Sequence, residues 1–321
     1  MKKRILSSLV LLALLAACAP AAVATKAPVA LVVEATQAPA VVDTSISLVD
    51  DLGREVTLEA PATRVVSLAA SNTELLFAVG AGDQMVGRDP YSNFPEEALT
   101  IQDIGDTFSG LNTEFILSLE PDLVLAAGIT PPEQVEQLEQ VGITVYWLGN
   151  PTDLEGLYRN IETVGLLTGH EQEALAAIDE LSARADAVLA KVATVTERPT
   201  VFYEVDGQTD PNAPFTAGAG SFIDLIINLA GGENVAGEIE GYFPFSIEDL
   251  LVADPDVILL GDFAWGATVE SVAARSGWGA LLAVTNDQVY PFNDDHMTRP
   301  GPRLINALEE LAKLLHPELF Q

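Results

Sequence analysis

The sequence has little of what stabilises or activates many exported proteins, because it contains 1 cysteine and 3 histidines in 321 residues. With Cys18 alone, no disulfide can form within the chain, and the fold depends on its apolar core. The histidines, His170, His296 and His316, lie far apart in the sequence. A receptor for bare zinc or manganese ions would need several His and carboxylate ligands at one site, so we set that class aside.

Basic residues are also scarce. Lysine and arginine total 15 against 47 aspartates and glutamates, which gives a formal net charge of -32. Nucleic acids and anionic lipid headgroups would be repelled by such a body. We therefore expect neither as a partner.

Motifs of catalysis are missing as well. The sequence contains no Gly-x-Ser-x-Gly elbow and no phosphate-binding loop. An enzyme would need a nucleophile with a base, or a bound metal. We expect no catalysis and no cofactor; an exported hydrolase or other enzyme on an α/β scaffold stays open as the alternative from another class.

The N-terminus has the pattern of a lipoprotein export signal. Lys2, Lys3 and Arg4 precede an apolar run, Ile5–Leu15, and the chain continues as Leu-Ala-Ala-Cys18. The run is too short to span a bilayer. We predict that residues 1–17 are removed and that Cys18 is lipidated, with residues 18–45, rich in Ala, Pro, Val and Thr, as a flexible tether. The protein would then be extracytoplasmic and anchored to the cell membrane by lipid alone; a membrane helix or an ordinary secretory signal is the alternative.

The remaining part of about 275 residues exceeds what one hydrophobic core usually organises. Short apolar runs typical of buried parallel strands alternate in it with helical patterns, which predicts an α/β fold with mostly parallel sheets. The predicted strands are Arg64–Leu68, Asp122–Ala126, Thr144–Trp147, Thr200–Tyr203, Asp256–Leu260 and Gln288–Tyr290. We predict two α/β lobes, 46–167 and 198–321, joined by one long helix, 168–197.

The two predicted lobes share an internal repeat. Ser71–Leu75 with the glycines that follow it has the spacing of Ser221–Leu225 with its own glycines, and Thr113–Leu125 matches Ile247–Leu259. In the second pair a helix ends at a carboxylate, proline stops it and a buried strand follows. Two similar lobes facing each other would form a cleft that encloses a ligand.

Several segments together resemble one family over almost the whole chain after the tether. They are Arg64–Leu68, Ser71–Gly80, Pro90–Pro95, Leu111–Glu114, Glu120–Val124, Ala230–Val235 and Arg299–Leu304. In this order they are similar to the cobalamin and ferric-siderophore substrate-binding proteins of ABC importers. The resemblance implies two lobes bridged by one long helix, limited hinge motion and a metal chelate held in the cleft between the lobes.

Large chelates need apolar and aromatic walls with a few placed polar groups. The resemblance places Tyr91 against the ligand, and puts Phe108 at a position where cobalamin-binding relatives carry tryptophan. It also matches Asp295 and Arg299 to cleft residues, although Arg299 could instead be a structural partner of Asp294. Aromatic residues in loops ahead of helices complete the expected ligand-binding set: Phe215, Tyr242 and Phe243. Ala127 stands where cobalamin binders have another tryptophan, which leaves one wall open.

The resemblance gives two glutamates a second role. Glu114 and Glu248 occupy equivalent places in the repeat, each near the start of a helix, where the helix dipole alone would favour a carboxylate. In the family one glutamate on each lobe docks onto arginines of the membrane permease, a dimer. Glu74 is the competing candidate, but Ser71-x-x-Glu74 has the spacing of a capping box.

The partners implied are a chelate and an ABC permease dimer with its ATPase, and the protein is expected to be a monomer. The sequence does not choose between a corrinoid and a ferric siderophore. Haem is a further candidate, with Tyr91, Tyr242 and His296 as the available axial ligands. An adhesin or a sensory ectodomain is not excluded by composition.

Overall fold

The computed structural model describes residues 44–105, 107–108 and 110–321. The predicted signal peptide, the predicted lipidation site Cys18 and nearly all of the predicted tether lie outside the described residues. Residues 44–321 form one compact unit. Within it we call residues 44–168 the N-terminal half and residues 200–321 the C-terminal half. Among the described residues, no helix is both long and apolar enough to cross a membrane.

The N-terminal half is built on a four-stranded parallel sheet in the order β4-β3-β5-β6. Its strands are β3 (Val65–Ser67), β4 (Met85–Arg88), β5 (Leu123–Ala127) and β6 (Val145–Leu148). The helices of this half are α1 (Ala70–Ala78), α2 (Thr113–Ser118), α3 (Pro132–Gln140) and α4 (Leu154–Thr168). An antiparallel pair, β1 (Ile46–Val49) and β2 (Glu55–Leu58), precedes them.

The C-terminal half has a second parallel sheet, in the order β12-β11-β7-β9. Its strands are β7 (Thr200–Glu204), β9 (Glu233–Asn234), β11 (Val257–Leu260) and β12 (Val289–Pro291). The helices are α6 (Phe222–Leu229), α7 (Ile247–Ala253), α8 (Val269–Ala273), α9 (Leu282–Thr285), α10 (Asp294–Met297) and α11 (Leu304–Leu315). Short 3₁₀ helices lie between elements of both halves and at the C-terminal end: η1 (Gly82–Gln84) and η2 (Glu96–Thr100) in the N-terminal half, and η3 (Gly261–Trp265), η4 (Trp278–Ala280) and η5 (Pro317–Phe320) in the C-terminal half.

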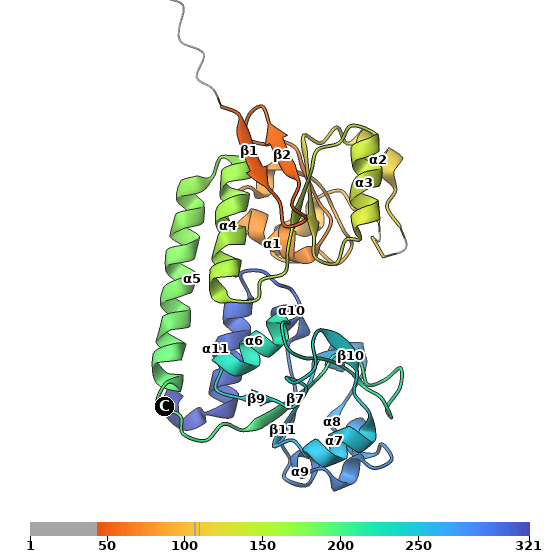
Figure 1. The fold of residues 1–321 in the computed structure, drawn as a ribbon, viewed down its shortest axis with the longest axis vertical. Helices are drawn as coiled ribbons and strands as arrows, with labels where there is room; N and C mark the ends of the chain where they lie inside the picture. The colour runs from red at the N-terminus through yellow and green to blue at the C-terminus, as the bar shows by residue number, and fades with distance from the viewer. Residues whose placement is uncertain (1–43, 106, 109) are drawn as a thin grey trace, which may run out of the picture. The chain divides into compact units, whose positions relative to one another are not determined.

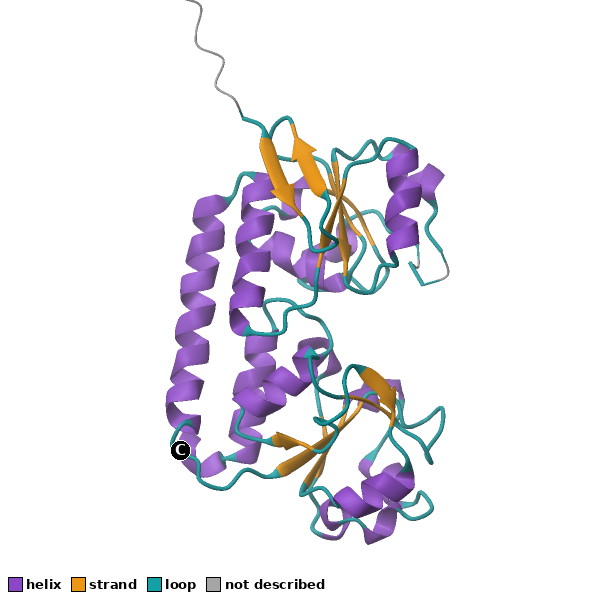
Figure 2. Cartoon of the chain, viewed as in Figure 1, coloured by secondary structure: helices purple, strands orange, loops and turns teal. Residues whose placement is uncertain are grey.

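The predicted α/β class with parallel sheets is confirmed, and each of the six predicted strands is present within two residues of its expected bounds. Figure 2 shows the strands of each sheet enclosed between helices. The buried apolar runs explain this, because strands covered on both faces have no polar side to alternate with.

The internal repeat is visible in the fold. The first sheet runs β4-β3-β5-β6 and the second, read from β9, runs β9-β7-β11-β12, so equivalent strands occupy equivalent places. The aspartate after each repeat proline makes the same bonds. Asp122 accepts from the amide and hydroxyl of Thr63 at 2.8 and 2.9 Å, and Asp256 accepts from those of Thr200 at 2.8 and 2.8 Å.

One long helix, α5 (Glu171–Val192), runs beside both halves and packs against α4 and α1 of the first and α11 of the second (Figure 1). It is shorter than the predicted stretch of 168–197. Gly169 ends α4 in the left-handed conformation, with φ of 76°, and so separates the two helices. The lobe boundaries themselves stay predictions.

A single apolar core connects the two sheets. It includes Leu75 of α1, Leu181 of α5 and Leu308 of α11, all buried. Separate clusters cover the outer face of each sheet. Pulling the halves apart would expose part of the shared core to water, which opposes large movement between them.

Two local expectations were wrong. The segments around Phe215 and Tyr242 are not loops but an antiparallel pair, β8 (Phe215–Ala217) with β10 (Tyr242–Pro244). Ser71 is not a helix cap, because α1 begins one residue before it and Ala69 is the cap position.

Candidate ligand-binding hollow

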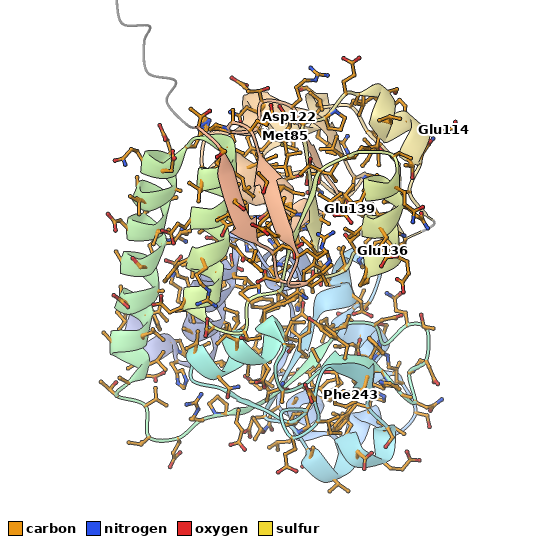
Figure 3. All side chains as sticks on the ribbon, turned by 45° about the horizontal axis from the view of Figure 1, so that its top comes forward. Met85, Glu114, Asp122, Glu136, Glu139 and Phe243 are labelled. Carbon is orange, nitrogen blue, oxygen red and sulfur yellow. The ribbon has the colours of Figure 1, made fainter. Side chains whose placement is uncertain are left out.

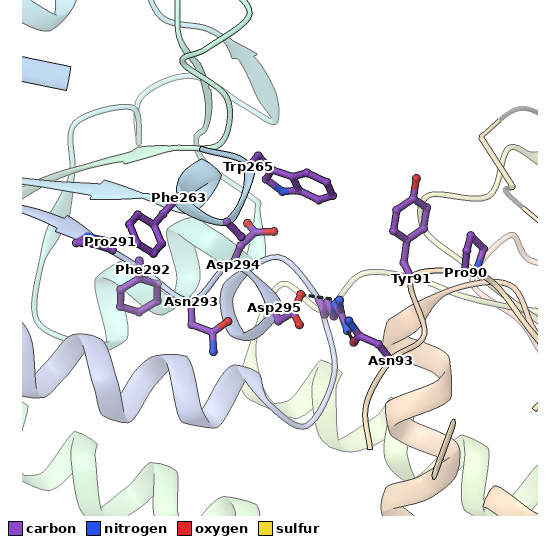
Figure 4. Close-up of a pocket in the computed structure, with 12 residues that line it drawn as sticks. Pro90, Tyr91, Asn93, Phe263, Trp265, Pro291, Phe292, Asn293, Asp294 and Asp295 are labelled. Carbon is purple, nitrogen blue, oxygen red and sulfur yellow. Dashed lines mark hydrogen bonds and ion pairs between the residues drawn. The ribbon is translucent and has the colours of Figure 1, made fainter. Parts of the chain in front are cut away.

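Two adjoining hollows, which we together call the ligand hollow, lie between residues of the two halves. Their volumes are about 580 and 290 Å³. Residues common to both are Tyr91, Trp265, Asp294, Asp295 and Arg299. The larger hollow is also lined by Pro90, Asn93, Phe263, Ala264, Pro291, Phe292 and Asn293, most of which Figure 4 shows. The smaller one adds Ala69, Ala70, Ser71, Asp89, Phe108, Ala127, Ile129, Asn150, Thr298 and Pro300.

The parallel sheets explain why these residues meet. Tyr91 follows the end of β4, Ala127 ends β5, and Trp265 and Asp294 follow β11 and β12. All lie at or beyond the carboxyl ends of parallel strands, where ligands of open α/β sheets bind. Because both sheets direct these ends to the same space, the hollow draws on both halves.

Aromatic side chains form the walls. Tyr91 and Trp265 come from opposite halves and project toward the same space (Figure 4). Their side chains are 42% and 71% exposed. Phe108, 68% exposed, meets Tyr91 edge to face, with ring centroids 5.9 Å apart. Three large exposed rings around one hollow provide the apolar surface that a broad, partly flat ligand needs.

Arg299 lines the hollow and contacts three polar partners. Its guanidinium lies 2.5 Å from Asp295, donates to the Asn93 side-chain oxygen at 2.7 Å and to Glu74 at 3.4 Å. The expected alternative partner was Asp294, whereas the close carboxylate is Asp295, one turn back along the chain. Arg299 therefore joins the loop after β4 to the segment after β12.

Glu74 has a different role from the one its spacing predicts. Its carboxylate, only 3% exposed, accepts from Arg303 at 2.6 and 2.9 Å. The capping-box interpretation is wrong, since Ser71 lies inside α1 and no side chain caps that helix. Glu74 instead links α1 of the N-terminal half to the start of α11.

The carboxyl groups of the hollow are partly sheltered from water. Burial raises the pKa of Asp294, while hydrogen bonds from Thr298 and Tyr203 oppose the shift. Burial likewise raises the pKa of Asp89, against the hydrogen bond from Ser92. In residues 44–105, 107–108 and 110–321, no group of three or more His, Cys, Asp or Glu residues is placed to hold a metal ion.

Four of the seven predicted ligand residues line the hollow: Tyr91, Phe108, Asp295 and Arg299. Phe215, Tyr242 and Phe243 do not line either part of it. Tyr242 packs against Phe222 with centroids 6.2 Å apart, and Phe243 against Phe245 at 6.1 Å. Their contact with a ligand stays a prediction.

Trp265 and Phe263 were missed by the sequence reading. They lie in η3 directly after the buried strand β11, between Gly261 and Gly266. Two aromatics in a glycine-bounded segment at a strand end could have been recognised as ligand-facing by the reasoning used for Phe215 and Tyr242. Ala127 was expected to leave one wall of the hollow without an aromatic ring. Ile129, two residues further along the chain, also lines the smaller hollow and has a half-exposed side chain.

Glu114 and Glu248 are both exposed in the first turns of α2 and α7, at matching repeat positions. Figure 3 shows Glu114 at the outer edge of α2. The match extends to the helix ends, where Glu120 and Asp254 adopt left-handed φ angles of 48° and 42°. The two helices are therefore structural copies that each present a carboxylate outward.

The chain is similar in sequence to proteins of known family. The model of the periplasmic binding protein family matches residues 65–295. An uncharacterized ABC transporter substrate-binding lipoprotein, YvrC of Bacillus subtilis, is 31% identical over 281 residues, covering 86% of this chain and 87% of YvrC. The vitamin B12-binding protein of Vibrio cholerae is 31% identical over 259 residues, covering 79% of this chain and 90% of that protein.

Solved structures of periplasmic binding proteins resemble the fold of this chain. The periplasmic vitamin B12-binding protein BtuF of Vibrio cholerae has a TM-score of 0.70 and 29% identity, over 81% of this chain and 99% of BtuF. The periplasmic heme-binding protein RhuT of Roseiflexus sp. RS-1 has a TM-score of 0.72 and 28% identity, over 80% of this chain and 99% of RhuT. The resemblance read from the sequence motifs is confirmed, and the chain belongs to the periplasmic binding protein family, among the substrate-binding proteins of ABC importers.

Proposed function

We propose that this protein captures a metal chelate, a corrinoid or a ferric siderophore, outside the cytoplasm and delivers it unchanged to an ABC permease and its ATPase. The observation that carries the proposal is the pair Tyr91 and Trp265, which face one hollow of about 580 Å³ from opposite halves. A volume of this order suits a bulky organic ligand. Haem is the second candidate ligand, supported by the likeness to RhuT.

Delivery requires a place on the outside of the protein for the permease. Glu114 and Glu248, exposed on the repeated helices α2 and α7, are the proposed docking residues. Lipidation of Cys18 would keep the monomer near the membrane. The likeness to a substrate-binding lipoprotein supports this anchoring.

Capture without chemistry fits the side chains of the hollow. No histidine lines either part of it, and His296, the nearest along the chain, contacts Glu310 at 3.1 Å instead. Among the described residues, the hollow therefore offers no histidine base to activate its serine or threonine hydroxyls.

The experiment is a titration of the purified protein with cyanocobalamin, a ferric siderophore and haemin, read by tryptophan fluorescence and thermal unfolding. At least one chelate should quench the fluorescence and raise the Tm, since a ligand that binds only the folded state stabilises it. A free tryptophan analogue titrated in parallel corrects for light absorbed by the chelates. If no chelate changes either signal, the proposal is wrong.

A further inference from the structure

The charge lining the ligand hollow is unbalanced toward negative. Its charged side chains are Asp89, Asp294, Asp295 and Arg299, three carboxyls and one guanidinium. The surrounding protein has the same sign, with a net charge of -32. A field of this sign lowers the local concentration of anions before any contact is made.

The one cation of the hollow is already neutralised. Arg299 pairs with Asp295 at 2.5 Å and also faces Glu74 at 3.4 Å. Arg303, the next cation below it, is engaged by Glu74 at 2.6 Å and by the ring of Phe94 at 4.2 Å, and it does not line the hollow. Neither guanidinium is therefore free to form a new bidentate pair with an anionic ligand.

The lining of the hollow carries no net positive charge, whichever way its buried carboxyls titrate. With Asp89 and Asp294 ionised, the lining has two excess negative charges. With both protonated, the Asp295 and Arg299 charges cancel and the lining is neutral. In neither state does it carry the net positive charge that would offset the lost hydration of a polyanion.

We propose that the ligand hollow selects chelates without net negative charge whose periphery carries amide or amine groups, and discriminates against chelates that present several carboxylates or phenolates. This inference rests on the proposed function. Amide and amine N–H groups can donate to Asp294 and Asp295, which are acceptors when ionised. A ligand carboxylate at the same place would meet like charge, and such a contact is a device for rejecting the wrong partner.

The test compares ligands that share a metal or a ring but differ in charge. The pairs are a dicyano corrin with seven amide side chains against its heptacarboxylate, a neutral ferric trihydroxamate against a trianionic ferric tris-catecholate, and an iron porphyrin dimethyl ester against its diacid. Within each pair that binds, we expect the less anionic member to bind at least tenfold more tightly. The preference should shrink as salt is raised, because screening weakens the repulsion.

A variant links the preference to named residues. Asp295→Asn removes the closest partner of Arg299 and should reduce the preference within a pair about tenfold, by improving binding of the anionic member. Asp294→Asn should act in the same direction and serves as a second variant if the first is unstable. Glu162→Gln, an exposed site on α4 outside the hollow, changes the net charge equally and should leave the preference unchanged.

The outcomes separate the two proposals. If the anionic member of a binding pair binds as tightly as its neutral counterpart, or if Asp295→Asn leaves the preference unchanged, the charge selection is wrong and capture stands. If no chelate of either charge binds, the proposed function fails and this inference fails with it.

Discussion

Two tryptophans of the C-terminal half have opposite environments. Trp265 lies in η3 with a largely exposed ring in the hollow, whereas Trp278 is completely buried and donates its indole N–H to the Pro211 carbonyl at 3.0 Å. Trp278 also packs edge to face with Phe202, with centroids 6.5 Å apart. One ring is free to meet a ligand, and the other holds the core together.

Trp265→Ala should therefore weaken chelate binding roughly 10- to 100-fold, the equivalent of about 1.5–3 kcal/mol of lost apolar contact, and leave the thermal unfolding midpoint of the free protein nearly unchanged. It should also remove most of the ligand-dependent fluorescence quenching. Titration and a melting curve check both.

Trp278→Ala is the matched control, since it deletes the same side chain from the core and should cost about 3–5 kcal/mol of stability. An unaltered dissociation constant for Trp265→Ala would show that its ring does not contact the ligand.

Some of the residues that line the ligand hollow could be predicted from the sequence, and others could not. Arg299 could be placed at the hollow because it follows the strand predicted at Gln288–Tyr290, a position that topology determines. Tyr91 was placed there only by the family resemblance, since the strand before it, β4, was not predicted. The position of Phe243 could not be predicted from the sequence. Its side-chain direction depends on the pairing of β10 with the antiparallel strand β8, because alternate side chains of a strand face opposite sides. Thr216, which lies opposite Phe243 in the pair, is 27 residues earlier in the chain, and no local sequence pattern predicted that pairing.

At the scale of elements, apolar runs were the reliable signal. The central strands β5 and β11 are entirely buried, so their sequences are continuous in Val, Leu, Ile and Ala. The edge strands β4 and β9 were not predicted, because β4 contains glycine and arginine and β9 has only 2 residues. Edge strands pair on one side only and carry weaker compositional constraint.

The repeated helices α2 and α7 carry the docking prediction. Reversing both Glu114 and Glu248 to Lys should leave chelate affinity within about twofold and reduce uptake at least tenfold, because like charges would then face a permease that pairs with carboxylates. Binding is measured by titration, and uptake is measured in cells or in vesicles that contain the permease and its ATPase.

A control pair is available on other helices. Glu133 and Glu270 are exposed in the first turns of α3 and α8, so reversing them changes the same total charge at the same kind of position. Uptake should survive in that control. Equal loss of uptake in both double variants would indicate a general charge effect and remove Glu114 and Glu248 from docking.

For the molecule as a whole, the duplicated sheets are joined in two ways. The shared apolar core runs through α1, α5 and α11, and charged side chains cross between the halves beside the hollow. The sequence predicted the long helix and the repeat, since both are local patterns. The crossing charges were not predictable, because Glu74 and Arg303 are separated by 229 positions and Glu74 had a plausible local partner.

Glu74→Gln tests whether those charges hold the halves together. The substitution leaves the buried Arg303 without its closest carboxylate, and removing one member of a buried pair costs about 3–5 kcal/mol. In a protein of this size each kcal/mol of lost unfolding free energy lowers the Tm by about 2–4 °C, so the Tm should fall by roughly 6 °C or more. Glu309→Gln is the control, because it breaks the partly exposed pair with Arg184, 2.9 Å apart, and should cost no more than about 1 kcal/mol.

The companion variant separates pairing from packing. Replacing Glu74 and Arg303 together by Leu removes both charges, and buried pairs replaced by apolar residues are often tolerated. This double variant should be more stable than Glu74→Gln, yet it should bind chelate less tightly, because Arg299 loses part of its support. Equal melting points for Glu74→Gln and Glu309→Gln would contradict the structural role, and would leave the shared apolar core and α5 as the connection between the halves.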